Sequence, residues 1–171
     1  EKLEVLGRTA DRFSQSTFCQ FADQNDVLYC LDQGGVFRKP LAGGVQRLFR
    51  VKGDALLVHP TGKLFFVRAE RQVMAFDRIG RRLKTWYFSS TPFLPSISAD
   101  GRVIAVGFSD RIELYDASLT QRARIEQPNA KGLVAPVLSP DGLRLYAIAP
   151  GVKRRYNTRG RGGRLERLAS T

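Results

Sequence analysis

The chain has 171 residues, 43% of them hydrophobic, which is enough to bury the core of a folded domain and argues against disorder for the body of the chain. Its 28 Lys and Arg against 16 Asp and Glu give a formal net charge of +12, which favours acidic partners such as nucleic acid, an anionic membrane surface or an acidic protein patch. No apolar run approaches the roughly 18–20 residues of a membrane span, so we expect a soluble chain.

A four-residue turn motif recurs about every forty residues. In chain order, its copies are Ala22-Asp23-Gln24-Asn25, His59-Pro60-Thr61-Gly62, Ser98-Ala99-Asp100-Gly101 and Ser139-Pro140-Asp141-Gly142. The glycines of the last three copies are 39 and 41 residues apart. In the first, degenerate copy Asn25 takes the glycine position, and asparagine tolerates the positive φ that such a turn requires.

A second regularity has the same period. Fourteen residues after each of the three glycines stands an aromatic residue followed by an Asx residue: Phe76-Asp77, Tyr115-Asp116 and Tyr156-Asn157. In the first unit the equivalent segment, Val36-Phe37-Arg38, comes two residues early, which we interpret as a shortened loop. Agreement at this offset in three copies indicates a true repeat.

Each repeat unit is predicted to contain four short strands. In the third unit the first strand ends at Ile97, and residues 103–108, 111–115 and 121–125 form the others. The second strand is apolar on both faces and therefore needs a cover on both faces, as stacked sheets provide. Glycine and proline recur too often for helices of normal length. The sequence therefore predicts an all-β fold.

Two sequence blocks resemble a known family. Residues 98–106 together with 112–116, and residues 139–146, resemble the strand-turn-strand signature of the WD-repeat and YVTN-repeat β-propellers. The resemblance covers roughly residues 13–170. It departs from the strict WD type, since no unit has the Trp-Asp or Gly-His pair, and the basic segment at 153–156 replaces the third strand of the fourth unit.

The resemblance implies a single β-propeller region over residues 1–171, built from four four-stranded antiparallel blades. The blades are expected at about 12–50, 51–88, 89–127 and 128–171. Residues 2–7 resemble the segment from Arg164 to Ala169, so we expect residues 2–8 to form the outer strand of a preceding blade.

The number of blades bears on assembly. Because ring closure buries the faces of the first and last blade, we favour a piece of a longer propeller, or a half ring completed by another copy or chain, over a compact four-bladed ring. The start at Glu1 instead of methionine fits a processing boundary with further sequence upstream. The end blades would then expose apolar strand faces, which predicts self-association or a protein partner.

No catalytic, cofactor or metal site is predicted. The single histidine, His59, falls in a turn position and has no cysteine or acid at ligand spacing, so we expect it to make local hydrogen bonds. Asp77, Asp116 and Asn157 are interpreted as caps of the turns that follow them. We therefore expect no enzyme, although the YVTN resemblance also includes enzymes whose sites draw on several blades.

The two cysteines lie on the first predicted hairpin. A loop of Asp23 to Asp26 would place Cys19 opposite Cys30, whereas the repeat-based turn at Ala22 to Asn25 places Cys19 opposite Leu28. We favour the second register, which predicts two buried free thiols and leans toward a reducing compartment, with a periplasmic or secreted location left open if an upstream signal is removed.

The C-terminal segment is the most basic part of the chain. Residues 151–171 hold seven basic residues against one acid and supply +6 of the net charge. The candidate residues for an anionic partner are Lys153, Arg154, Arg155, Arg159, Arg161 and Arg164. Arginines mixed with glycine and an aromatic residue are typical of nucleic-acid-binding segments, but we favour a solvated loop.

The sequence thus predicts a non-catalytic β-propeller scaffold that mediates protein–protein interaction or assembly. Two alternatives stay open: a nucleic-acid-associated protein that uses the basic segment, and a fragment of a YVTN-type propeller enzyme. The fold alone does not decide between them.

Overall fold

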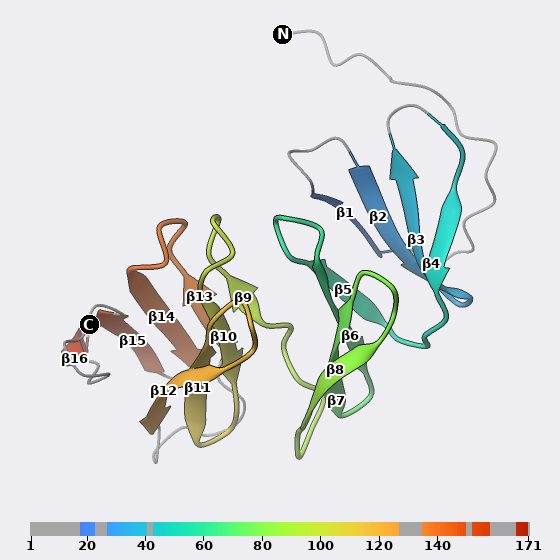
Figure 1. Ribbon diagram of the computed structural model, residues 1–171. Helices are drawn as coiled ribbons and strands as arrows, with labels where there is room; N and C mark the ends of the chain where they lie inside the picture. Colours follow the sequence, from blue (N-terminus) through green and yellow to red (C-terminus); the bar gives the residue numbers. More distant parts are fainter. Residues whose placement is uncertain are drawn as a thin grey trace, which may run out of the picture.

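The computed structural model describes residues 18–22, 27–40, 43–126, 135–149, 152–157 and 167–170, with the backbone alone from residue 148 onward. The described residues form four antiparallel sheets of four strands each, without a helix, which confirms the all-β prediction (Figure 1). Within this part of the chain, no helix has the length and apolarity needed to cross a membrane.

Each sheet, called a blade below, is a meander in which neighbouring strands follow one another along the chain. Blade 1 contains β1 (Phe18–Ala22), β2 (Val27–Asp32), β3 (Gly35–Pro40) and β4 (Gln46–Phe49). Blade 2 contains β5 (Ala55–Val58), β6 (Leu64–Ala69), β7 (Gln72–Asp77) and β8 (Arg82–Tyr87). Blade 3 contains β9 (Ser96–Ile97), β10 (Ile104–Gly107), β11 (Arg111–Tyr115) and β12 (Gln121–Glu126). Blade 4 contains β13 (Ala135–Leu138), β14 (Arg144–Ala149), β15 (Val152–Asn157) and β16 (Arg167–Ser170).

The blades pack face to face through three apolar clusters, one for each pair of neighbours. Alternate side chains of β6 serve two of them: Phe65 packs toward blade 1 and Phe66 toward blade 3. Phe65 lies edge-on to Tyr29 of blade 1, with ring centroids 5.2 Å apart. Burial on both faces explains why the second strands are apolar on both faces, as expected from the sequence.

In blades 2, 3 and 4 the predicted turns connect the first strand to the second. The amide of the first turn residue donates to a carbonyl five residues on: His59 to Leu64 at 2.9 Å, Ser98 to Val103 at 3.0 Å and Ser139 to Arg144 at 2.9 Å. Gly62, Gly101 and Gly142 have φ of 63°, 72° and 68°, in the left-handed region that favours glycine.

Polar side chains on the first strand of a blade also form hydrogen bonds to the first strand of the next blade. Gln20 of β1 accepts a hydrogen bond from the amide of Val58 in β5 at 2.9 Å. Ser96 of β9 accepts one from the amide of Leu138 in β13, also at 2.9 Å. Both side chains lie five residues before the last residue of their turn motif, so the repeat places the same cross-blade contact in two blades.

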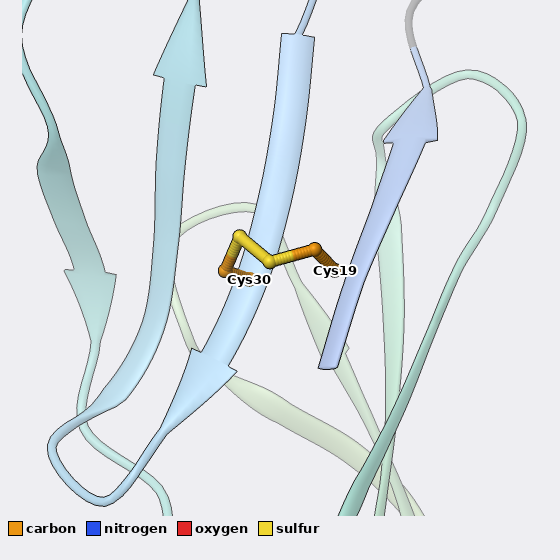
Figure 2. Close-up of a disulfide and its surroundings, with 2 residues drawn as sticks. All are labelled: Cys19 and Cys30. Atoms are coloured by element: carbon orange, nitrogen blue, oxygen red, sulfur yellow. A yellow bond between two sulfur atoms is a disulfide. The ribbon is translucent and has the colours of Figure 1, made fainter. Parts of the chain in front are cut away.

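The prediction of free thiols is wrong. Cys19 pairs with Cys30 across β1 and β2, and their sulfur atoms form a disulfide (Figure 2). The last strand pair of the hairpin is Ala22 and Val27, the same five-residue spacing as in the other three blades, so Ala22 belongs to strand β1 and not to the loop as the favoured register assumed. The expectation of a reducing compartment depended on free thiols, so the disulfide removes the support for it.

The prediction of a solvated loop at the basic segment is wrong for residues 152–157. They form strand β15, which pairs with β14 and β16, so the third strand of the fourth unit is kept. Backbone pairing does not depend on side-chain charge, and two residues of β15, Val152 at its start and Tyr156 next to its last residue, are good strand formers. The proposed outer strand at residues 2–8 and the loop at 23–26 lie outside the described residues, and the blade boundaries stay a prediction.

Candidate functional site

A hollow of about 320 Å³ lies between blades 2 and 3 and is the candidate functional site. Two segments line it, one at the end of β8 and the other around the β10–β11 turn. Its lining residues are Tyr87, Phe88, Ser89, Phe108, Ser109, Asp110 and Arg111. Its volume is at the lower end of the roughly 300–1,000 Å³ typical of ligand pockets. We call this hollow the inter-blade groove.

Two stacked aromatic rings join the two sides of the inter-blade groove. The rings of Phe88 and Phe108 have centroids 4.9 Å apart and an interplanar angle of 19°. Backbone hydrogen bonds hold each segment: the Phe88 amide donates to the Arg71 carbonyl at 2.9 Å, and the Phe108 amide to the Arg111 carbonyl at 2.8 Å. The groove therefore rests on a fixed apolar base.

Arg111 is held by an aromatic ring and two carboxylates. Its guanidinium carbon lies 3.9 Å from the centroid of the Phe108 ring. Its Nε donates to Oε1 of Glu113 at 2.7 Å and Nη1 donates to Oδ1 of Asp110 at 2.9 Å. Burial alone would lower the pKa of Arg111. The hydrogen bonds to Glu113 and Asp110 and their negative charges have the larger effect, so the pKa of Arg111 is raised.

The network continues into the packed interface. The buried carboxylate of Glu113 also accepts a hydrogen bond from the hydroxyl of Tyr115, which in turn accepts one from Nε1 of Trp86 at 3.0 Å. The ammonium group of Lys84 lies 4.2 Å from the centroid of the Tyr115 ring. Burial and the bond to Glu113 raise the pKa of Tyr115 to about 12. These residues join blades 2 and 3 and orient Glu113 toward Arg111.

His59 occupies a turn, as predicted, and makes the expected local contact with Thr61, Nδ1 to Oγ1 at 2.8 Å. The sequence did not predict its second contact, between Nε2 and the carbonyl oxygen of Gly101 in blade 3 at 2.8 Å. A Cβ atom added to Gly101 would lie only 2.2 Å from the His59 ring. His59 thus joins two blades.

Asp77 and Asp116 cap the turns that follow them, as predicted. Oδ1 of Asp77 accepts the amides of Ile79 and Arg81 at 3.1 and 2.8 Å. Oδ1 of Asp116 accepts the amides of Ser118 and Thr120 at 2.9 and 3.0 Å. Hydrogen bonding by Ser118 first, and then by the neighbouring donors, lowers the pKa of Asp116 to about 2.

The basic candidate residues divide into two groups. Lys153, Arg154 and Arg155 lie on β15, where Arg155 stands opposite Tyr146 in the strand register. Arg159, Arg161 and Arg164 lie outside the described residues, as does the side chain of Asn157. Nucleic-acid binding by this segment stays a prediction. Among the described residues, no group of three or more His, Cys, Asp or Glu could hold a metal ion.

The outer face of blade 4 keeps apolar side chains exposed. Val137 of β13 and Tyr146 of β14 stand opposite each other and are 44% and 38% exposed. Tyr146 is the fourth residue after its turn glycine, and the residues at that position in blades 2 and 3, Phe66 and Ala105, are both 0% exposed because the next blade covers them. We call Val137 and Tyr146 the end-blade patch.

Solved structures with the same arrangement exist. The β-propeller domain of Cps50 (Swd1) from Myceliophteria thermophila aligns with 90% of this chain at a TM-score of 0.60 and 16% identity. A functionally unknown protein from Desulfotomaculum acetoxidans aligns with 89% at a TM-score of 0.63 and 15% identity. No protein-family model and no curated protein matches the sequence.

The chain has a β-propeller fold. At 16% and 15% identity the likenesses concern the fold alone, and on that point they confirm the prediction made from the repeat. The aligned region spans 56% and 54% of the length of those two chains.

Proposed function

We propose that this chain is a segment of a larger β-propeller assembly and acts as a non-catalytic scaffold that binds protein through its end blades, including a second copy of itself. We infer that its repeats are of the WD or YVTN type, on the strength of the motifs at residues 98–116 and 139–146. Support for an incomplete ring comes from the β-propeller domain of Cps50 (Swd1), of which the chain spans only 56%.

The end-blade patch is the observation that carries the proposal. Val137 and Tyr146 form a cross-strand apolar pair, and the next blade buries the residues at the position of Tyr146 in blades 2 and 3. Burying such side chains against another sheet releases about 25 cal/mol for each Å² of apolar area removed from water, so a second sheet would be stabilised on this face. Phe21 of β1, 51% exposed, provides apolar surface on blade 1.

Sedimentation velocity at micromolar concentration tests the proposal. We expect the chain to self-associate, and we expect the double variant Val137→Lys/Tyr146→Lys to sediment as a monomer because two ammonium groups would have to be buried. Ile79, 81% exposed on the β7–β8 turn, provides the matched control, and Ile79→Lys should associate like the parent chain. A parent chain that stays monomeric would contradict the proposed self-association.

A further inference from the structure

A second binding surface, separate from the end-blade patch, is present at the inter-blade groove. The groove combines an exposed aromatic ring, a carboxylate and two serines on segments that the fold holds in place. Tyr87 is 75% exposed at the end of β8, although its neighbour Trp86 is buried. A large exposed aromatic residue beside a hollow is typical of contact sites in protein interfaces.

The more exposed charge on the groove lining is the carboxylate of Asp110 and not the guanidinium of Arg111. Arg111 is the basic residue among the lining side chains, and its guanidinium is already shared between the carboxylates of Asp110 and Glu113. The lining side chains are therefore balanced in charge, and the buried Glu113 behind them is already paired with Arg111 and Tyr115. The Asp110 side chain is 54% exposed, so its carboxylate can accept a further hydrogen bond. A cationic ligand can therefore reach the carboxylate of Asp110, whereas the guanidinium of Arg111 is only 25% exposed and already donates to two carboxylates.

We propose that the inter-blade groove binds an arginine side chain of a peptide segment in a partner protein. The guanidinium would stack on the exposed ring of Tyr87 and donate to Asp110, while Ser89 and Ser109 accept hydrogen bonds at the rim. Planar guanidinium groups form both kinds of contact, and Arg111 already packs on Phe108 in the same way. The volume of about 320 Å³ suits one long side chain with its flanking backbone.

The test is an NMR titration of the isotope-labelled chain with the blocked peptide Ala-Ala-Arg-Ala-Ala and with the same peptide carrying citrulline, the neutral isostere of arginine. We expect the arginine peptide to shift the amide signals of Ser89, Ser109 and Asp110 in a saturable way. We expect the citrulline peptide to bind about tenfold more weakly, because the charge-assisted bond to Asp110 is lost. Equal binding of the two peptides, or no shift at these amides, would overturn the proposal.

Variants locate the binding site. Asp110→Asn should weaken binding of the arginine peptide about tenfold and Tyr87→Ala about fivefold. The matched control is Asp54→Asn, because Asp54 is 52% exposed and pairs with Arg68 outside the groove. This variant should bind the arginine peptide as tightly as the parent chain does. If Asp54→Asn weakens binding as much as Asp110→Asn, the effect is one of general charge and the proposal fails.

The same titration in Val137→Lys/Tyr146→Lys separates this proposal from the proposed scaffold function. An unchanged dissociation constant would support a site in the inter-blade groove that is independent of assembly. A loss of binding in this variant would assign the peptide to the end-blade patch and overturn the groove proposal.

Discussion

The imidazole of His59 in blade 2 lies within hydrogen-bond distance of the carbonyl oxygen of Gly101 in blade 3, 42 residues further along the chain, with Nε2 and the oxygen 2.8 Å apart. Because a carbonyl only accepts, Nε2 must carry the proton, and Nδ1 is left to accept from the hydroxyl of Thr61. In the next pair of blades the amide of Ala99 donates to the carbonyl of Pro140 instead. Pro60 has no amide proton to donate, and the His59 side chain replaces that bond.

Replacing His59 by alanine should lower the free energy of unfolding by about 2 kcal/mol, because a buried ring and a cross-blade hydrogen bond are lost together. Urea unfolding followed by circular dichroism measures the change. Lys63→Ala, an exposed substitution in the same hairpin loop, should change stability by less than about 0.5 kcal/mol. Equal effects of the two substitutions would show that His59 does not join the blades.

The disulfide between Cys19 and Cys30 should stabilise blade 1. The two cysteines are 11 residues apart in the sequence. Closing a loop of that size lowers the entropy of the unfolded chain and thereby stabilises the folded chain by roughly 3 kcal/mol. We expect Cys19→Ser/Cys30→Ser to unfold at lower urea concentration and to be insensitive to reductant, unlike the parent chain. Titration of the denatured, unreduced chain with a thiol reagent is the direct check, since two reactive thiols would contradict the disulfide.

The Asp116 cap predicts a specific pH dependence. Its pKa in the folded chain is about 2, below the ordinary value of 3.8, so its contribution to stability is present above pH 3.8 and is lost as the pH falls toward 2. Ser118→Ala removes the main hydrogen bond that lowers the pKa and should raise it. An NMR titration of the Asp116 carboxyl follows both chains, and an identical midpoint in the two would contradict the capping role.

The repeat was predictable because its signals are local. The glycines at 62, 101 and 142 need a left-handed conformation, and the Asx residues at 77 and 116 cap their own turns, so sequence spacing alone located both features. The disulfide register was predicted wrongly because the first residue of the turn motif, Ala22, was counted as part of the loop, whereas it pairs with Val27 at the end of the strand. The amide-to-carbonyl bonds five residues apart in the other turns supply the missing rule.

The inter-blade groove could not be predicted from the repeat. Its two segments, around Phe88 and Phe108, are brought together only when blade 2 packs on blade 3. The Arg111 to Glu113 spacing was visible in the sequence, since side chains two apart on a strand share a face. That pattern does not reveal that Tyr115 and Trp86 would bury Glu113. The polar contacts between blades are therefore properties of the packed fold.

Hydroxyl-radical footprinting of the parent chain at rising concentration tests most directly whether the end-blade patch is an assembly surface. Tyr146 should be oxidised at nanomolar concentration and protected at micromolar concentration, when another sheet covers it. Tyr87, 75% exposed at the inter-blade groove, is the internal reference and should be oxidised equally at both. Oxidation of Tyr146 that does not change with concentration would contradict assembly through blade 4.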